Sequence, residues 1–294
     1  MQHITAKPNQ HTLKFDSWHE FVTYAETAPS DMSQGQRKSH DNRMGAENHP
    51  VVKHWNGYPS WEDCIAKSKG GWAAGAAEIE KTFNSMTIPQ KRTEKEFAFS
   101  PVGPGTLSMG RFIQGHPEPW MTERDTDIVT EQAAIFGGVA HLGINISQSG
   151  GISARERFEM GALLLSLIDT LERNGVRVEL TLFNAITGGN GAWIRQAVKV
   201  KGADSSVNLS ILAAAFGNAG TQRRLCWGIR ETLDAKTRSD CSIGSGYGST
   251  DRKWFEGDCT AVEGLDKVFF SNADSRNNWL KTQLLKQGVA WDGE

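Results

Sequence analysis

The sequence predicts an α/β protein with three layers: a mainly parallel sheet with helices on both faces, preceded by an N-terminal α+β region. Two observations support this prediction. From about residue 138 onward, apolar runs with strand periodicity alternate with runs of helical periodicity. A strand, a helix and a second strand in succession imply a right-handed crossover, which makes the two strands parallel. We therefore expect one α/β domain over residues 138–294.

The elements of this domain follow one another along the chain. Residues 139–147 (VAHLGINIS) are predicted as a buried strand that ends in a serine- and glycine-rich turn. Residues 153–175 are predicted as a helix, because apolar residues recur on one face and Gly175 stands where a left-handed cap belongs. Residues 176–184 alternate as a strand. Further predictions are a strand at 192–202, a helix at 205–220, a strand or helix at 223–229, a strand at 265–273 and a helix at 275–288.

Residues 1–130 differ from the rest and are predicted as a Trp-rich α+β region that is wrapped on or beside the α/β domain. Helical spacing at residues 15–26 predicts an amphipathic helix, and the polar, breaker-rich residues 27–50 predict a mobile surface loop. A second helix is expected to begin at Ser60, whose side-chain oxygen can accept a hydrogen bond from a free N–H group. Residues 101–121 mix apolar groups with Gly and Pro, which favours strands and turns.

Composition limits the class of protein. With 38% hydrophobic and 22% charged residues, the 294-residue chain is expected to be globular. Its net charge of −2 gives no overall attraction to nucleic acid or acidic membranes. No apolar run approaches the roughly 18 residues of a membrane span, and the N-terminus lacks the pattern of a signal peptide. The four cysteines lack ligand spacing, so we expect reduced thiols and a cytoplasmic location.

Residues 137–185 contain the sequence Asn145-Ile-Ser-Gln-Ser149 and resemble von Willebrand factor A-type (VWA) domains. In that family a hydrophobic strand ends in Asp-x-Ser-x-Ser and is followed by a long helix and a second strand. The stretch LLLSLIDTLERNGVRVELTLFNAITGG is similar to the intracellular, cobaltochelatase-type branch. The whole chain is also similar to proteins encoded by bacteriophages and related mobile elements. The resemblance to VWA domains covers about half of the chain and implies a VWA-like fold there.

The resemblance also implies a degenerate metal site. In the family, the strand-end acid, two hydroxyls and residues from later loops hold Mg²⁺, which accepts a carboxylate from a partner protein. Asn145 replaces the acid with a neutral amide, whereas Mg²⁺ prefers hard oxygen ligands such as carboxylates. Two interpretations stay open: weak Mg²⁺ binding, or side chains that satisfy backbone groups after the metal is lost. The second is favoured, so no cofactor is expected. The candidate metal ligands are Asn145, Ser147 and Ser149, and the wider binding face adds Gly150, Thr187 and Asp204.

Other patterns were weighed for catalysis and for nucleic-acid binding. No G-x-S-x-G motif is present and no histidine follows His141, so an enzyme is not expected. The glycine-rich residues 241–258 lack the GK[ST] of a nucleotide-binding loop. Cationic and aromatic side chains provide an alternative nucleic-acid face. Its candidates are Arg195, Lys199, Lys201, Arg223, Arg224, Tyr247, Arg252 and Trp254.

The sequence therefore predicts a non-enzymatic binding or assembly protein of phage or mobile-element origin. We expect it to recognise a protein partner through the degenerate metal-site face. Self-assembly into a virion or filament is the first alternative, because ten tryptophans suit extensive interfaces. Binding of RNA or single-stranded nucleic acid is the second. The bacterial cytoplasm, or the virion, is the expected location.

Overall fold

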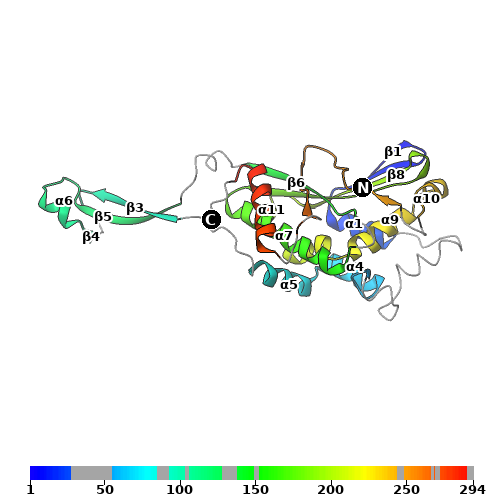
Figure 1. The fold of residues 1–294 in the computed structure, drawn as a ribbon, viewed down its shortest axis with the longest axis horizontal. Coiled ribbons are helices and arrows are strands. Elements are labelled where there is room, and N and C mark those ends of the chain that lie inside the picture. The colour runs from blue at the N-terminus through cyan, green and yellow to red at the C-terminus, as the bar shows by residue number, and fades with distance from the viewer. Residues whose placement is uncertain are drawn as a thin grey trace.

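A computed structural model describes residues 1–27, 55–84, 93–102, 106–127, 138–148, 152–243, 248–265, 268 and 272–289. These residues form an α/β body built on one sheet, from which a narrow β-arm projects (Figure 1). The body strands are β1 (Gln2–Lys7), β2 (Gln10–Phe15), β6 (Val139–Asn145), β7 (Arg177–Thr187), β8 (Trp193–Lys201), β9 (Ser249–Thr250) and β10 (Thr260–Ala261).

Helices and helical turns make up the rest of the body. They are α1 (Trp18–Glu26), α4 (Trp61–Gly70), α5 (Ala73–Asn84), α7 (Ala154–Arg173), η2 (Gly189–Gly191), α8 (Leu209–Leu212), η3 (Ala213–Gly217), η4 (Thr221–Cys226), α9 (Trp227–Glu231), α10 (Ala235–Asp240) and α11 (Ala273–Lys286). The arm contains β3 (Thr93–Ser100), β4 (Thr106–Leu107), α6 (Met109–Ile113) and β5 (Trp120–Asp127). Among the described residues, no helix combines the length and the apolar character needed to cross a membrane.

The body sheet has the strand order β1-β2-β8-β7-β6-β10, and β9 pairs with β7. The predicted α/β class is confirmed, and the sheet is mixed. β2·β8, β6·β7 and β6·β10 are parallel pairs, whereas β1·β2, β7·β8 and β7·β9 are antiparallel. The antiparallel β7·β8 pair has a simple cause: only residues 188–192 connect the two strands, which is too short for a crossover helix.

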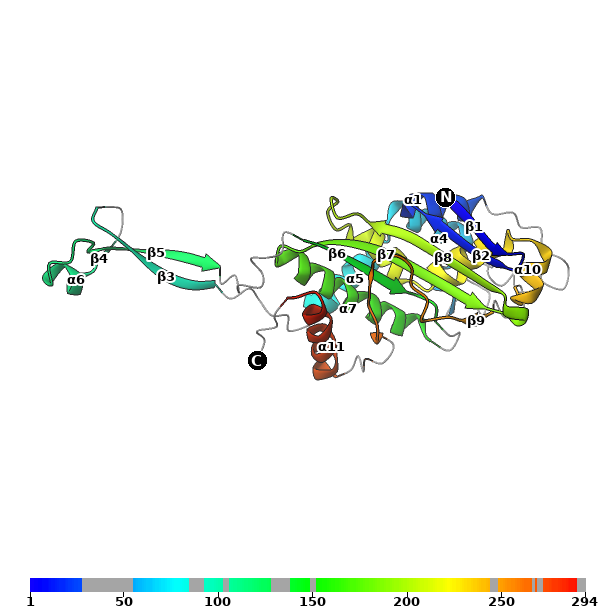
Figure 2. The same ribbon diagram turned by 90° about the horizontal axis from the view of Figure 1, so that it is seen from above.

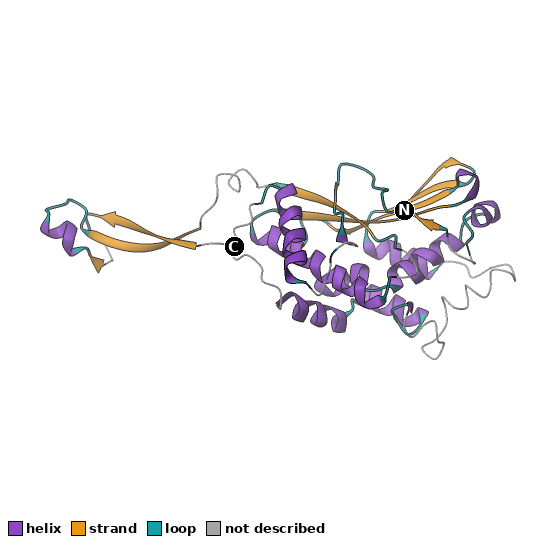
Figure 3. Ribbon diagram, in the orientation of Figure 1, coloured by secondary structure: helices purple, strands orange, loops and turns teal. Residues whose placement is uncertain are grey.

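The body helices among the described residues lie against one face of the sheet, and α11 lies beside the β10 edge (Figures 2 and 3). The opposite face is covered over β7 and β8 by the segment 251–259. There Trp254 packs against Phe183 and Ala197 in a small separate cluster. In the described part of the chain, this irregular segment stands where the sequence predicted a second layer of helices.

The predicted strand–helix–strand unit is confirmed as β6–α7–β7, with β6 and β7 parallel. Helix α7 begins at a capping box, in which Ser153 and Glu156 satisfy each other's backbone N–H groups. It ends before Gly175, whose φ of +78° is the left-handed conformation that favours glycine. The apolar face of α7 is buried against the sheet, and this packing fixes the side chains of its first turns beside the end of β6.

The N-terminal residues belong to the same body. Strand β2 pairs with β8, and α1 contributes Phe21 and Val22 to the core that α7 also enters. Trp18 Nε1 donates to the carbonyl oxygen of Ser68, which joins α1 to α4. Residues on both sides of position 130 therefore contribute to one core. Residues 93–127, within the predicted N-terminal region, form the separate sheet of the arm.

The remaining predictions have mixed outcomes. The helices expected at 15–26 and 275–288 are present as α1 and α11, and Ser60 caps α4 as predicted. The ambiguous segment 223–229 is helical, in η4 and α9. The loop expected at 27–50 falls outside the described residues except for Thr27, and so does most of the strand expected at 265–273.

Candidate functional site: a cavity at the end of strand β6

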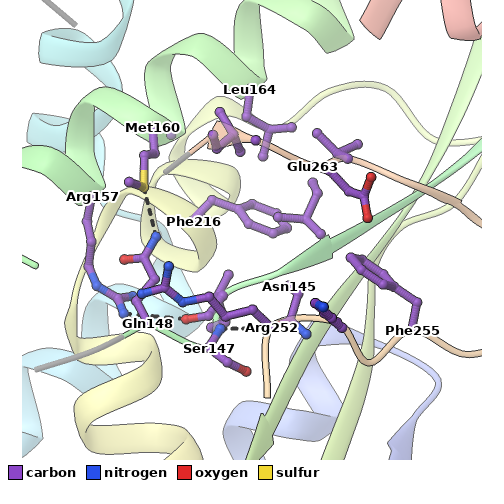
Figure 4. A pocket seen from close by; sticks show the side chains of 17 residues that line it. Asn145, Ser147, Gln148, Arg157, Met160, Leu164, Phe216, Arg252, Phe255 and Glu263 are labelled. Carbon is purple, nitrogen blue, oxygen red and sulfur yellow. Dashed lines mark hydrogen bonds between the residues drawn. The ribbon is translucent and has the colours of Figure 1, made fainter. Parts of the chain in front are cut away.

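A cavity of about 340 Å³ lies at the carboxyl end of β6 (Figure 4). The end of β6, the first half of α7, η3, and two segments on either side of β10 form its walls. Ligands of α/β proteins commonly bind outside the carboxyl ends of strands, so its location is typical of a binding site. Much of the wall is apolar, and its apolar side chains are Met160, Leu164, Phe216, Phe255, Val262 and Leu265.

Asn145 holds the loop beside the cavity. Its Nδ2 donates to the carbonyl oxygens of Asp251 (3.0 Å) and Trp254 (2.9 Å), and its Oδ1 accepts from the backbone N–H of Ser147 (2.9 Å). A carboxylate could not donate to two carbonyl oxygens. The asparagine at this position is therefore explained by the loop that it fastens to the sheet.

Ser147 also has a structural partner. Its side chain is fully buried, and its Oγ accepts a hydrogen bond of 2.6 Å from the backbone N–H of Ala185 in β7. Both described residues of the predicted metal motif thus satisfy backbone groups at the sheet edge. Ser149 and Gly150, the other two residues of this turn in the predicted site, lie outside the described residues.

Arg157 enters the cavity from the first turns of α7 (Figure 4). It is only 3% exposed, and its guanidinium group donates to the carbonyl oxygen of Ile146 (3.4 Å) and to Oε1 of Gln222. Its Nε has no hydrogen-bond partner. Burial and the nearby guanidinium groups of Arg223 and Arg252 lower the pKa of Arg157 to about 9, which leaves it charged at neutral pH.

The side-chain amide of Gln222 holds the backbone amide of Gln148, a residue that lines the cavity. Gln222 Nε2 donates to the carbonyl oxygen of Gln148 (3.1 Å), while its Oε1 accepts from the backbone N–H of Gln148 (3.4 Å). The same Oε1 accepts from Arg157. Gln222 comes from η4, a π-helical turn, and such turns are frequent at functional sites. The arginine is thus oriented by two segments, the residues that follow β6 and η4.

The charge of the cavity is positive. Among the described residues that line it, Arg157, Arg252 and Lys253 are cationic and Glu263 is acidic, which gives three positive charges against one negative. Arg252, Lys253 and Glu263 are exposed at the rim, whereas Arg157 is buried. A buried cation in apolar surroundings attracts an anion strongly, because water screens the charge little.

This donor set suits Mg²⁺ poorly. The Asn145 oxygen faces a backbone N–H, the Ser147 hydroxyl accepts from another, and a guanidinium group lies next to both. In the described part of the chain, no group of three or more His, Cys, Asp or Glu side chains is placed to hold a metal ion. The positive charge at this strand end is the guanidinium group of Arg157.

The other predicted binding residues lie elsewhere. Thr187 is four residues past Phe183, the partner of Asn145 in β7, or about 13 Å along the strand. Asp204 lies at the opposite end of the sheet, in a second cavity with Glu172 and Arg177. Its placement follows from the antiparallel course of β8, which returns the chain to the start of β7. The sequence prediction had included Asp204 in the binding face with Asn145.

The nucleic-acid candidates do not form one surface. Lys201, Arg223, Arg224 and Trp254 are buried, so a nucleic acid cannot contact them as the sequence suggested. Lys199 pairs with Glu179 at 2.5 Å, and Arg195 lies over the Trp193 ring with 4.3 Å between the guanidinium carbon and the ring centroid. Arg252 is exposed at the cavity rim. Tyr247 lies outside the described residues.

Arg223 and Arg224 bind backbone carbonyl oxygens of the chain itself. Arg223 donates to the carbonyl oxygens of Trp55 (2.5 Å) and Ile152 (2.6 Å), and Arg224 donates to that of Tyr58 (2.9 Å). These contacts attach the segment before α4 to η4. Arg230, a third buried arginine, lies in α9 and donates to Oδ1 of Asn184.

Sequence reasoning did not select Arg157, although a signal was present. Arg157, Met160, Gly161 and Leu164 follow the spacing of one helical face, so an arginine occupies a position in the buried stripe of α7. A cation in such a register is unusual, because charged side chains are rarely fully buried without a partner. The rim residues could not be found this way, because they come from irregular segments.

Comparisons with known proteins bear on the chain as a whole. No curated protein and no solved structure matches it. A family model described as a domain of unknown function, DUF7192, matches residues 3–288, which include both the body and the arm. The chain therefore belongs to the DUF7192 family.

Proposed function

We propose that this chain is a non-enzymatic binding protein with a VWA-like core, which recognises a partner protein at the carboxyl end of β6. The observation that supports the proposal is the cavity there, which combines apolar walls with a buried guanidinium group. Among the described lining residues, Ser147 carries the one hydroxyl; it accepts from a backbone N–H, and no described basic side chain is bonded to it. The arrangement is suited to recognition rather than to catalysis.

The VWA-like part of the proposal rests on the sequence resemblance and on the order of elements. The degenerate motif follows a buried strand, and a long helix and a parallel strand come next, as the resemblance implies. A partner would approach the edge where Asn145 fastens the 251–254 loop. The resemblance also motivates a phage or mobile-element origin, with action in the bacterial cytoplasm or in the virion.

Self-assembly is the second candidate, and the β-arm favours it. Four apolar side chains at or near its tip are exposed: Val102 (83%), Met109 (58%), Phe112 (56%) and Ile113 (76%). The arm projects from the body (Figure 1), so its tip is positioned to reach another molecule. Exposed apolar clusters commonly mark interaction sites. Nucleic-acid binding is less favoured, because half of its candidate residues are buried.

One experiment separates these functions. The purified chain is examined by size-exclusion chromatography with light scattering and its ultraviolet absorbance ratio, before and after nuclease. It is then used to capture partners from host cells in EDTA. We expect a small, nucleic-acid-free particle that retains a partner without metal. A large nuclease-resistant mass would instead support self-assembly, and a nuclease-sensitive absorbance would support nucleic-acid binding.

Two double variants locate the binding face. Arg252→Gln with Lys253→Gln removes both rim cations of the cavity, whereas Lys7→Gln with Arg177→Gln removes two exposed cations far from it. Each pair changes the net charge equally. Partner capture should fall with the first pair and persist with the second. Equal capture by both variants would exclude the cavity rim as the binding face.

A further inference from the structure

We propose that the cavity at the end of β6 binds a carboxylate attached to an apolar group, and that Arg157 is the residue that pairs with it. This inference rests on the proposed function and names the chemistry that the partner presents there. Four features of the described residues carry it: the partners of Arg157, the engagement of nearby acids, the charge balance, and the shape of the cavity.

Arg157 has donors left over. A guanidinium group carries five N–H donors, and the described residues offer it two acceptors, the Ile146 carbonyl and the Gln222 amide. Both acceptors are neutral, and Nε has no partner. Burying a charge without an opposite charge lowers the stability of the fold. A cation that is only 3% exposed is therefore a candidate for a functional role.

The acids nearest in sequence are committed elsewhere. Glu156 closes the capping box at the start of α7, where its Oε2 accepts from the backbone N–H of Ser153 (2.7 Å). Glu159 accepts from Nε of Arg155 (3.1 Å) on the exposed side of the helix. Neither carboxylate pairs with Arg157. The capping box also places a negative charge at the start of α7, which disfavours a second anion there.

The cavity as a whole selects an anion with an apolar body. Its three cations outnumber its single acid, and the buried one lies beyond apolar walls formed by Met160, Phe216 and Phe255. A phosphate prefers several donors around it, such as a helix N-terminus or a cluster of cations. Here one planar guanidinium group lies inside and the other cations stay at the rim. That geometry matches a carboxylate: Ile146 and Gln222 occupy the Nη2 donors of Arg157, and its Nε–H can donate a charge-assisted hydrogen bond to one carboxylate oxygen.

The volume sets the size of the group. About 340 Å³ equals the space of roughly eleven water molecules. This volume is sufficient for an acidic group together with one aromatic or aliphatic side chain. Two sources on a partner protein share this chemistry: a C-terminal carboxylate that follows an apolar residue, and an internal Asp or Glu beside one.

The test uses the full chain and a small probe, 3-phenylpropionate, with its amide as the uncharged control. Binding is measured by calorimetry and by the rise in Tm that a ligand specific to the folded state produces. We expect the carboxylate to bind at least about tenfold more tightly than the amide, because the amide cannot form a charge-assisted pair. Equal binding of the two probes, or no binding of either, would overturn the proposal.

Variants assign the interaction to Arg157. Arg157→Met keeps an unbranched apolar side chain of similar length and should abolish the preference for the acid, while Arg157→Lys should keep part of it. Should Arg157→Met fail to fold, the rim variant Arg252→Gln with Lys253→Gln gives the answer, since it should weaken 3-phenylpropionate several-fold. The variant Lys7→Gln with Arg177→Gln should leave binding unchanged. Unaltered preference for the acid in Arg157→Lys and in the rim variant would assign the carboxylate elsewhere.

Peptides then identify the source of the carboxylate and keep the two proposals apart. One peptide ends in a phenylalanine with a free carboxylate, and another has capped ends and an internal Phe-Glu pair. Tighter binding of the first assigns the site to chain termini, and tighter binding of the second assigns it to internal acids. If partner capture depends on the rim cations but acid and amide probes bind equally, the carboxylate proposal fails and the binding function stands. If the acid probe binds more tightly than the amide but partner capture does not depend on the rim cations, the carboxylate proposal stands and the proposed binding face fails.

Discussion

Two buried cations lie at opposite ends of the same sheet, and their surroundings differ. Lys201, at the end of β8, has a side chain that is 3% exposed, and its Nζ donates to the carbonyl oxygens of Val178 (2.8 Å) and Gly202 (3.2 Å). Its Nζ also lies 2.7 Å from the carboxylate of Glu172. Arg157, at the end of β6, is equally buried but has only neutral acceptors among the described residues.

The difference separates a structural cation from one that is available to a ligand. The chain supplies every partner that Lys201 needs, including an opposite charge, so its positive charge is fully used within the fold. Arg157 faces a cavity with apolar walls and two more cations at the rim. Burial alone therefore does not indicate function. Whether the fold supplies an opposite charge to a buried cation says more about its role than the exposed fraction of its side chain does.

Substitution by methionine at each cation should give opposite results, and this is the largest effect we expect. Lys201→Met leaves two carbonyl oxygens without a donor and removes the partner of Glu172, which should lower the free energy of unfolding by about 3 kcal/mol. Arg157→Met removes a buried charge that has no acidic partner among the described residues, so its change in the free energy of unfolding should stay within about 1 kcal/mol. Urea denaturation of both variants measures the contrast. A larger loss in Arg157→Met than in Lys201→Met would make Arg157 the structural cation.

Restoring the acid of the VWA motif should not restore its metal. Asn145→Asp loses the two hydrogen bonds to Asp251 and Trp254 and turns a carboxylate toward their carbonyl oxygens. We expect a loss of about 2 kcal/mol in the free energy of unfolding. We also expect no rise in Tm with millimolar Mg²⁺, because Arg157 lies where a second cation would be repelled. Asn145→Ala is the control for the lost hydrogen bonds. A Tm that rises with Mg²⁺ in Asn145→Asp alone would show that the metal site is intact except for this residue.

The sequence predicts the parts of this fold that depend on local periodicity and capping. The β6–α7–β7 unit follows from alternating and helical patterns, and the α4 start at Ser60 and the α7 end before Gly175 follow from cap chemistry. The position of Asp204 depends on whether β8 runs parallel or antiparallel to β7. The connection of residues 188–192 is too short for a crossover helix and favours the antiparallel direction, so the sequence did contain this information.

The sequence indicated a site at the end of β6, but it did not indicate the cations that line the cavity there. Asn145 and Ser147 do lie at the strand end, whereas the cationic character comes from Arg157 and from Arg252 and Lys253, which are distant in the sequence. Such a meeting depends on tertiary packing. In the sequence, the position of Arg157 on the buried face of α7 was the local indication of a buried cation. It is easily missed, because the other residues of that face are mostly apolar.

The smallest effect tests whether Glu156 could serve as the counter-charge of Arg157. Backbone and side-chain hydrogen bonds with Ser153 hold the pKa of Glu156 below its ordinary value of 4.5. A carboxylate with a lowered folded-state pKa stabilises the fold above its unfolded-state pKa, and this contribution is lost as the pH falls through the lower value. Glu156→Gln keeps the capping geometry and removes the charge. It should therefore lower the free energy of unfolding by about 0.5 kcal/mol near neutral pH, and the difference from the wild type should vanish in acid.

Glu159→Gln, which removes the exposed ion pair with Arg155, is the matched control on the same helix and should change stability by about 0.3 kcal/mol. Denaturation at several pH values compares the two variants. A loss of several kcal/mol in Glu156→Gln, together with weaker binding of 3-phenylpropionate, would mean that Glu156 compensates Arg157 through space. Arg157 would then resemble Lys201, with its charge already used within the fold. A small, acid-sensitive loss with unchanged probe binding keeps the two cations distinct.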